Sequence, residues 1–341
     1  MFGYYLELAL RSLRRNKVLT ALMVLAIGLG IGASMTMITV LHVMTADPLP
    51  GRSAQLFYPQ IDPHDMVGYA KNKAPPDQLT WIDAMNLLHA RRAVRQVAMT
   101  AGQVVVQPAQ GSSRAFFVSA RYTSADFFTM FEVPFAYGSG WTAADDARQA
   151  RVVVIARDLA DKLYGADHAV GQSLRLGKDV FRVVGVIDPW QPVPRFYDLT
   201  QGSYAKVEQV FMPLETAMAL KQLTEGNFMC WGDQALNNKD MKRASCTWIQ
   251  FWAQLDTPAQ VASYRDYLVH YSQEQKALGR FQRPPNVRLH DLMGWLDANH
   301  VVPGSVQLQT LLALGFMLVC LVNTVALLLV KFLRRGAELG I

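Results

Sequence analysis

The sequence predicts an α+β domain carried between two transmembrane α-helices. Two long segments without charged residues lie near the ends of the chain, and they enclose residues 45–305, which have the mixed composition of a folded, water-exposed domain. Apolar residues make up 51% of the chain and the mean hydropathy is +0.10, which is high for a soluble protein. Membrane-spanning segments are therefore the first feature to locate.

The two apolar segments cover residues 18–44 and residues 306–330, and neither contains Asp, Glu, Lys or Arg. At about 1.5 Å per residue, each is long enough to cross a hydrocarbon core of about 30 Å. A cleaved signal peptide is the alternative for the first segment, because basic residues precede it. The apolar core of a signal peptide is only about 7 to 15 residues long, so we expect an uncleaved anchor.

Basic residues flank the two apolar segments on the sides nearest the chain termini. Lys and Arg concentrate at the cytoplasmic ends of membrane helices, so we expect both termini in the cytoplasm and the domain on the other side. The tails account for +5 of the formal net charge of +6, through Arg11, Arg14, Arg15, Lys17, Lys331, Arg334 and Arg335 against Glu7 and Glu338. The pI of 9.2 therefore reflects membrane topology and does not indicate nucleic-acid binding.

Residues 1–17 form a cytoplasmic lead in which apolar side chains recur at helical spacing opposite charged ones. This pattern predicts an amphipathic helix lying on the inner face of the lipid bilayer. A flexible basic lead is the alternative.

The domain between the apolar segments shows strand and helix patterns in mixed order, which is typical of an α+β fold. We expect strands at residues 56–61, 96–106, 115–120, 151–155, 180–187, 209–212, 247–255 and 287–290. We expect helices at residues 80–91, 124–131, 157–164, 214–220 and 258–276. Thr80 and Thr257 stand where helix N-caps are expected, with Pro258 at the first helical position of its helix. Residues 291–300 are expected to form a helical stalk that leads into the second apolar segment.

One stretch of the domain, FFVSARYTSADFF at residues 116–128, resembles a signature of the periplasmic core domain of MacB-like permeases. The elements that follow it in that family have counterparts here in the same order: FEVPF at 131–135, YGSG at 137–140, an acidic pair at 145–146, VVVI at 152–155, LADKLYG at 159–165, VGQSL at 170–174 and FRVVGV at 181–186. The ordered series, bracketed by two apolar segments, resembles a MacB-like or FtsX-like ABC transporter permease.

The resemblance implies a two-lobed periplasmic domain in a bacterial inner membrane. One lobe would comprise residues of about 45–114 and 245–305, and the second, inserted lobe about 115–244. It also implies four transmembrane helices per permease, a second permease copy or paralogue forming a dimer, a cytoplasmic ABC ATPase and a periplasmic adaptor protein as partners. Residues 331–341 resemble the start of the segment that docks on the ATPase, with Arg334, Arg335, Glu338 and Gly340 as coupling candidates. We therefore expect a truncated permease, or one whose second half is encoded separately.

Motifs for catalysis, cofactors and metals do not emerge from the sequence. The nearest approach to a nucleotide-binding loop, residues 171–178, has five residues between its glycines instead of four, and Asp179 replaces the required hydroxyl. The run at 138–140 lacks the spacing of a nucleophile elbow, and the seven histidines form no pair at metal-ligand spacing. We expect a protein that is not an enzyme, with ATP hydrolysis on a separate partner subunit.

Two small groups of residues are candidates for structural roles. Cys230 and Cys246 both fall in the domain and are a plausible disulfide in an oxidising compartment, with two separate thiols as the alternative. Gly28, Gly30, Gly32 and Ser34 would let another helix approach the first apolar segment closely, the alternative being lipid-facing flexibility.

Aromatic residues mark two further features. Trp231, Trp248 and Trp252 are expected in the core, where they would pack, although exposed tryptophans would form a binding surface. The Pro- and aromatic-rich loop at residues 190–197 fits a core turn and a binding surface equally well.

Two functions of different classes fit these features. In the favoured one, the chain couples ATP hydrolysis by a partner ATPase to a periplasmic conformational change, termed mechanotransmission, for export of a peptide, lipid-linked or drug-like cargo. The alternative is a two-helix membrane sensor or a regulator of a cell-envelope enzyme. The ordered resemblance favours the permease.

Overall fold

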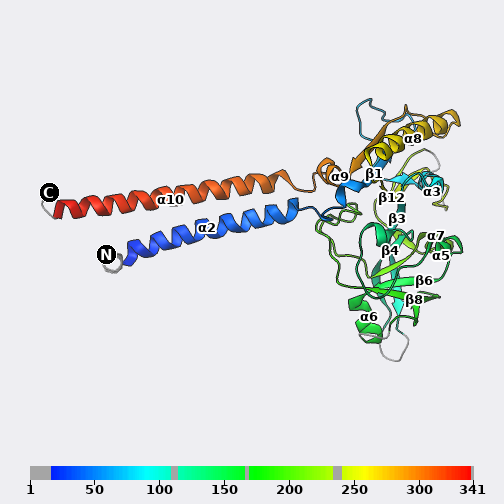
Figure 1. Ribbon diagram of the computed structural model, residues 1–341, viewed down its shortest axis with the longest axis horizontal. Helices are drawn as coiled ribbons and strands as arrows, with labels where there is room; N and C mark the ends of the chain where they lie inside the picture. Colours follow the sequence, from blue (N-terminus) through cyan, green and yellow to red (C-terminus); the bar gives the residue numbers. More distant parts are fainter. Residues whose placement is uncertain (1–16, 109–113, 166–168, 233–239, 339–341) are drawn as a thin grey trace. The chain divides into compact units, whose positions relative to one another are not determined.

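The structure is a computed structural model that describes residues 17–108, 114–165, 169–232 and 240–338 (Figure 1). The chain divides into two compact units. One unit contains the two apolar helices, and the other is the domain formed by Asp47–Asn299.

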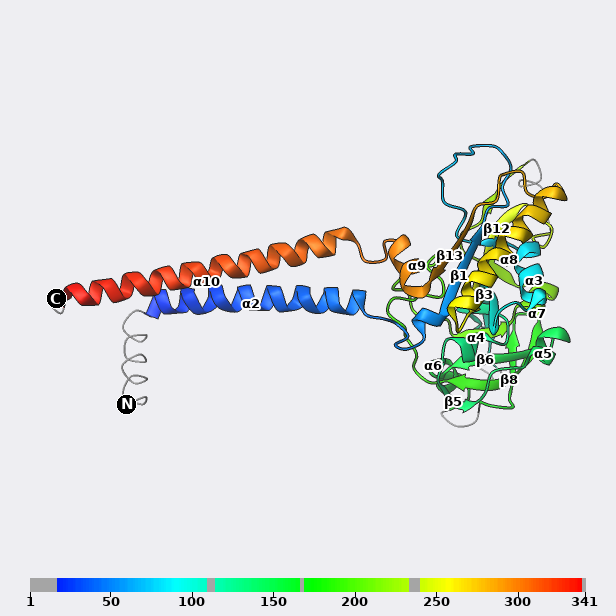
Figure 2. The same ribbon diagram turned by 45° about the horizontal axis from the view of Figure 1, so that its top comes forward.

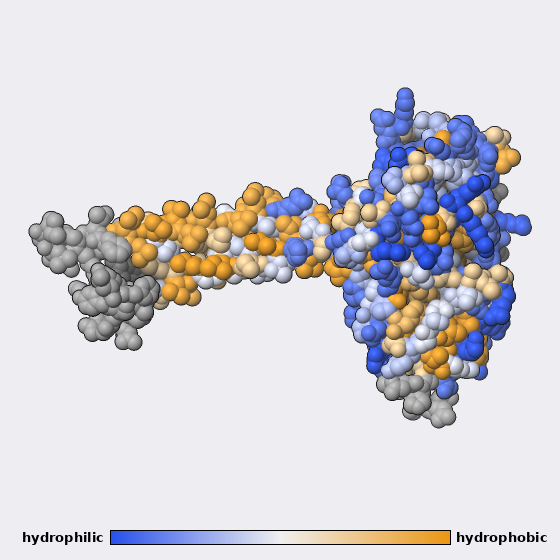
Figure 3. Space-filling view, in the orientation of Figure 1, coloured by the Kyte–Doolittle hydropathy of each residue, from blue (hydrophilic) through white to orange (hydrophobic). Residues whose placement is uncertain are grey.

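The apolar helices are α2 (Lys17–Thr45) and α10 (Gly304–Glu338), each of which contains one of the predicted apolar segments. Their candidate membrane spans, Thr20–Thr45 and Gly304–Leu329, have hydropathies of 2.1 and 2.5, and Figure 3 shows apolar residues along both helices. The hydroxyl of Ser34 donates a hydrogen bond of 2.9 Å to the carbonyl of Ala313. Small side chains on α2 therefore allow α10 to lie close to the backbone of α2.

The domain is built on one mixed sheet with the strand order β13-β1-β12-β3-β4-β9-β6-β8-β5. Its strands are β1 (Leu56–Ile61), β2 (Leu79–Thr80), β3 (Arg95–Gln107), β4 (Phe116–Thr123), β5 (Phe135–Gly138), β6 (Val152–Ala156), β7 (Ser173–Leu176), β8 (Asp179–Ile187), β9 (Val210–Pro213), β10 (Leu223–Glu225), β11 (Met229–Cys230), β12 (Cys246–Gln254) and β13 (Val287–Asp291). The β4–β9 and β6–β8 pairs are parallel, and the other pairs are antiparallel.

Helices of different lengths are distributed along the same unit. They are η1 (Ser53–Gln55), α3 (Trp81–Ala90), α4 (Phe127–Met130), α5 (Ala143–Ala147), α6 (Arg157–Tyr164), α7 (Leu214–Ala219), α8 (Pro258–Ala277) and α9 (Leu292–Ala298). The mixed order of helices and strands confirms the predicted α+β class. The 13-residue strand β3 pairs with β12 through its first half and with β4 through its second, so one sheet runs through both predicted lobes. Their boundaries stay a prediction.

Helix starts follow the predicted capping residues. The Thr80 side chain accepts a hydrogen bond from the Asp83 backbone N–H at the start of α3, and Thr257 forms a capping box with Gln260 at the start of α8. Asp83, which is fully buried, also accepts hydrogen bonds from Tyr271 Oη at 2.7 Å and from Arg280 Nη2 at 2.8 Å. These contacts hold α3 against the C-terminal part of α8 and the residues that follow it.

One predicted helix is longer than the helix in the structure, and several short elements of the structure were not predicted. The helix expected at residues 124–131 is only α4, because the Ser124 N–H donates to the Ala98 carbonyl and extends the strand pairing to that residue. The short strands β2, β5, β7, β10 and β11 and the capped helix α5 were not predicted. Strands of two to four residues carry too little alternation of apolar and polar side chains to be recognised.

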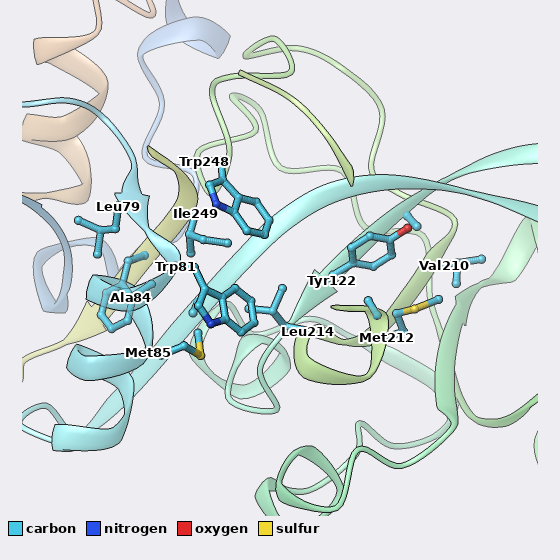
Figure 4. Packing of buried hydrophobic residues seen from close by; sticks show 14 of the residues in the cluster. Leu79, Trp81, Ala84, Met85, Tyr122, Val210, Met212, Leu214, Trp248 and Ile249 are labelled. Atoms are coloured by element: carbon cyan, nitrogen blue, oxygen red, sulfur yellow. The ribbon is translucent and has the colours of Figure 1, made fainter. Parts of the chain in front are cut away.

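The core lies between the sheet and its helices. Trp248 is 1% exposed and stacks with Trp81 of α3 at a ring-centroid distance of 5.9 Å (Figure 4). Trp252 is completely buried, so the expected core position is confirmed for both of these β12 tryptophans. Trp231, in contrast, is only half-buried and packs against the His64 ring.

We expect Trp248→Ala to lower the free energy of unfolding by about 3–5 kcal/mol, because it removes a large buried side chain and leaves a cavity. The matched control is Ile82→Ala on neighbouring α3, where the side chain is 36% exposed and the cost should be well under 1 kcal/mol. Thermal or denaturant unfolding of the detergent-solubilised chain measures both values. Equal losses in the two variants would contradict the packing described above.

Candidate functional site

Both chain connections from the domain to the apolar helices arise at one pair of strands. β1 and β13 are antiparallel, and the register pairs Phe57 with Asp291 and Ile61 with Val287. The start of β1 and the end of β13 therefore lie at the same end of this strand pair, where Figure 2 shows them side by side. We call this end of the β1–β13 pair, with residues 47–55 and α9, the junction.

The segment that approaches β1 is held by polar contacts. Asp47 accepts hydrogen bonds from the Leu49 N–H at 2.9 Å and from the Ser53 hydroxyl. Arg52 donates a 3.3 Å hydrogen bond to the Gln254 side chain at the end of β12 and lies 3.5 Å from a Glu132 carboxylate oxygen. The first residues of the domain are thus attached to the sheet before β1 begins.

The segment that leaves β13 is held by capping and by aromatic packing. Asp291 caps α9 by accepting a 2.8 Å hydrogen bond from the Gly294 N–H. Leu292 and Leu296 are buried, and the ring of Trp295, 3% exposed, stacks on Tyr58 of β1 with centroids 3.9 Å apart and planes 15° apart. α9 is therefore packed onto the sheet directly after the strand it follows.

Aromatic contacts continue from the junction into the domain. Tyr58 meets Trp252 of β12 edge-on at 5.0 Å, and Trp252 contacts the rings of Phe131 and Phe196 at 5.9 Å each. The indole N–H of Trp252 donates to the Tyr197 carbonyl at 3.1 Å. Packed rings thus connect α9 with the loop at residues 188–209.

A buried charge cluster anchors that loop. Arg121 of β4, completely buried, lies 2.7 Å from an Asp198 oxygen and donates to Glu208, which also accepts hydrogen bonds from Arg195 Nη1 at 3.1 Å and from Tyr197 Oη at 2.8 Å. Two cations face two anions, so the cluster is formally neutral. Burial by itself would lower the pKa of Arg121, but the charges of Glu208 and Asp198 outweigh it and raise that pKa.

The pKa of Asp198, the acidic partner of Arg121, is shifted in the opposite direction. Burial by itself would raise the pKa of Asp198, but the charge of Arg121 and a hydrogen bond from Thr200 outweigh it and lower that pKa. Asp198 and Arg121 are therefore held in their charged forms near neutral pH. The loop at residues 188–209 is fixed to the sheet by ion pairs as well as by aromatic packing.

A separate polar cleft of about 370 Å³ lies between α3, α5 and α7 and is lined by Arg91, Arg95, Asp126, Asp146 and Glu215 among others. Burial raises the pKa of Asp146 to about 6; hydrogen bonds from the Ala125 N–H and the Trp141 indole oppose the shift, and the charges of Glu215 and Asp126 add to it. Within the described residues, no three His, Cys, Asp or Glu side chains are grouped as a metal site would require.

Comparison with known families assigns the domain. The family model of the MacB-like periplasmic core domain matches residues 20–271, which is more than half of the chain. The chain belongs to the MacB-like periplasmic core domain family. This family supplies the extracytoplasmic domain of ABC transporter permeases, which supports a transporter role in general terms.

Solved structures and curated sequences complete the comparison. The periplasmic region of MacB from Actinobacillus actinomycetemcomitans aligns with a TM-score of 0.44 and 12% identity, over 73% of this chain and 94% of that one. The extracellular domain of the ABC-type transporter YknZ from Gram-positive bacteria aligns with a TM-score of 0.43 and 12% identity, over 68% of this chain and 99% of that one. No curated protein gives a significant sequence match.

The site residues predicted from the sequence lie in three places in this MacB-like chain. Cys230 on β11 and Cys246 on β12 stand directly opposite each other and are joined by a disulfide in the structure. Gly30 and Ser34 lie against α10, whereas a methyl group added at Gly28 or Gly32 would meet no atom within 4 Å.

The predicted ATPase-coupling residues lie at or beyond the C-terminal end of α10. Arg334, Arg335 and Glu338 belong to the last turns of α10, and the structure describes their backbone alone; Gly340 lies outside the described residues. Their proposed role stays a prediction.

Sequence reasoning missed the residues that make the junction and the charge cluster. Leu292, Trp295 and Leu296 have the spacing of a buried helix face, and this signal could have identified the packed side of α9. Arg121 stands within the stretch that resembles MacB-like permeases, but a single arginine in a strand pattern gives no sign of burial. Its partners Asp198 and Glu208 come from a loop far along the chain.

We expect Arg121→Met to destabilise the domain by about 3–5 kcal/mol, because two buried carboxylates would then face one cation, Arg195, instead of two. Arg243→Met is the matched control, since the side chains of Arg243 and Asp240 are 86% and 57% exposed and lie 3.9 Å apart, and such a surface pair contributes about 0–1 kcal/mol. Denaturant unfolding measures both. A loss of less than 1 kcal/mol in Arg121→Met would show that the cluster does not anchor the loop.

We expect Asp146→Asn to change how stability depends on pH. Because the folded-state pKa of about 6 lies above the unfolded value of about 4, the contribution of Asp146 to stability is fully present below pH 4 and is lost as pH rises through 6. The Asn variant lacks this loss, so between pH 4 and 7 it should gain roughly 1–2 kcal/mol relative to the native chain. Unfolding measured at several pH values tests this, with exposed Asp161→Asn as the control; parallel curves for Asp146→Asn and the native chain would contradict it.

Proposed function

We propose that this chain is a permease subunit of a MacB-like ABC transporter, in which ATP hydrolysis by a partner ATPase drives a conformational change of the periplasmic domain. The observation that carries this proposal is the junction, where both connections to the apolar helices meet on the β1–β13 pair and α9 is stacked onto Tyr58 through Trp295. A relative movement of α2 and α10 would then act on one corner of the sheet.

The membrane arrangement of the proposal rests on charge. The basic tails favour a cytoplasmic position for both termini, which leaves Asp47–Asn299 on the periplasmic side of a bacterial inner membrane. The disulfide between Cys230 and Cys246 agrees with an oxidising compartment. The mature chain would keep α2 as an anchor.

Coupling to the ATPase is assigned to the C-terminal end of α10. Arg334, Arg335, Glu338 and Gly340 would contact the ATPase on the cytoplasmic side, and a second permease subunit would complete the assembly. The movement would serve export of a peptide, lipid-linked or drug-like cargo, with a periplasmic adaptor as a further partner.

Mechanical transmission requires the domain to respond as a unit. Aromatic packing from Trp295 through Tyr58 and Trp252 to the loop at residues 188–209, together with the buried charge cluster, supports such a response. Closely packed side chains transmit displacement because their interior has few voids to absorb it.

The proposal is tested by co-purification in mild detergent of the native chain with the ABC ATPase encoded beside its gene. We expect the ATPase to be retained by the native chain and lost, by at least tenfold, from the double variant Arg335→Ala, Glu338→Ala. Lys17→Ala, a charge removed at the cytoplasmic end of the other helix, is the matched control and should retain the ATPase. If no ATPase is retained by the native chain, the permease role fails and the sensor or envelope-regulator role takes its place.

A further inference from the structure

A second cleft, of about 430 Å³, lies between the loop at residues 188–209, the start of α6 and the end of β8. Its volume falls within the range of about 300 to 1,000 Å³ that is typical of small-molecule sites. The permease role described above assigns no ligand to this cleft. Its lining therefore has to be read for the chemistry that it would accept.

Trp190 forms an aromatic wall of the cleft. The sequence pattern at residues 190–197 fitted a core turn and a binding surface equally well, and the structure contains both: Phe196 and Tyr197 are completely buried, whereas Trp190 is only half-buried and lines the cleft. The Trp190 ring stacks on Tyr197 with centroids 5.4 Å apart and planes 11° apart, and Phe127 meets it edge-on at 6.1 Å. The indole is thus held in place without a ligand.

Hydrogen-bonding side chains beside the indole are held by contacts with one another. Arg157 donates a 3.3 Å hydrogen bond to Asp188, and its guanidinium lies 5.7 Å from the centre of the Tyr137 ring. Asp158 accepts a 2.7 Å hydrogen bond from Gln209 Nε2. Donors and acceptors that are already positioned lose little freedom when a ligand binds.

The two arms of the loop are joined at the cleft. The side chain of Gln191 donates a 2.9 Å hydrogen bond to the Ala205 carbonyl and accepts one of 3.1 Å from the Val207 N–H. The residues on either side of the buried charge cluster therefore form one continuous wall.

The charges that line the cleft balance one another. Arg157 and Lys206 carry two positive charges, and Asp158 and Asp188 carry two negative ones. Glu208 also lines the cleft, but its carboxylate is paired with the two arginines of the buried cluster. Balanced charge does not favour a strongly charged ligand, and a lining in which most residues are polar does not suit a wholly apolar one. A neutral polar ligand with one apolar face fits both conditions.

We propose that this cleft binds a neutral saccharide, with one pyranose ring packed on Trp190 and its hydroxyl groups hydrogen-bonded to Arg157 and Asp158. The face of an aromatic ring carries partial negative charge, so the weakly positive C–H groups of a sugar ring pack on it. A hydroxyl group both donates and accepts hydrogen bonds, so neighbouring hydroxyls match a guanidinium that lies beside a carboxylate. The proposal goes beyond the permease role and does not depend on it.

The proposal is tested by saturation-transfer NMR on the full chain in lipid nanodiscs, with maltose, cellobiose and N,N′-diacetylchitobiose as probes. Nanodiscs avoid the sugar headgroups of common detergents, which would compete for the cleft. We expect at least one probe to bind, with the strongest saturation on the C–H protons of one pyranose ring. If none of the three binds, the proposal is overturned.

Trp190→Ala should weaken the binding of that probe by about tenfold or more, because it removes the stacking face. The matched control is Trp231→Ala, since Trp231 is a half-buried tryptophan outside the cleft, and this variant should bind the probe as the native chain does. Equal losses in the two variants would show that the sugar does not stack on Trp190.

A second pair of variants leaves the interior of the loop untouched. Asp158 is exposed at the start of α6, so Asp158→Ala should fold normally and weaken binding about 3- to 10-fold through the loss of a hydrogen bond to the sugar. Asp161→Ala, which changes an exposed carboxylate of the same helix outside the cleft, should have no effect. Unchanged affinity in Asp158→Ala would contradict the proposed placement of the hydroxyl groups.

Discussion

The antiparallel pairing of β1 with β13 is the constraint on which the rest of the domain depends. β1 comes from the start of the domain and β13 from its end, so their pairing closes the whole domain into one unit and brings its two chain ends to one place. The loop entropy of joining residues so far apart must be offset by the contacts that the pairing allows. Those contacts are substantial: β1 is buried along its length, and Trp295 stacks on it from α9.

The interior beyond this strand pair combines aromatic packing with buried charge. Large rings contribute area and defined geometry, while the Arg121 cluster fixes the loop at residues 188–209 through directional contacts. A buried ion cluster contributes little net stability compared with well-packed apolar side chains. Here the cluster holds this long loop, which contains several prolines, in a single arrangement. A fixed loop suits a domain that must respond to displacement as one body.

The sequence was informative wherever structure is decided locally. Charge-free length identified both apolar helices, short runs rich in apolar and aromatic residues located β1 and β12, and capping threonines marked the starts of α3 and α8. Partners distant in the chain were not predictable: Arg121 reads as a surface residue until Asp198 and Glu208 are placed beside it, and β10 and β11 exist only because β3 and β12 supply hydrogen bonds. At the candidate site, the cysteine pair could be named from its setting, but the stacking of Trp295 on Tyr58 depends on the β1–β13 register.

The most direct test of the account is hydrogen–deuterium exchange of the permease–ATPase assembly with and without ATP. If the ATPase acts on the domain through the junction, nucleotide should change exchange in β1, β13 and α9, and to a lesser extent in the loop at residues 188–209, while β7 and β8 remain unaffected. An assembly in which ATP changes exchange only in the ATPase and in the cytoplasmic end of α10, with the junction unaltered, would contradict the claim that the junction transmits movement to the domain.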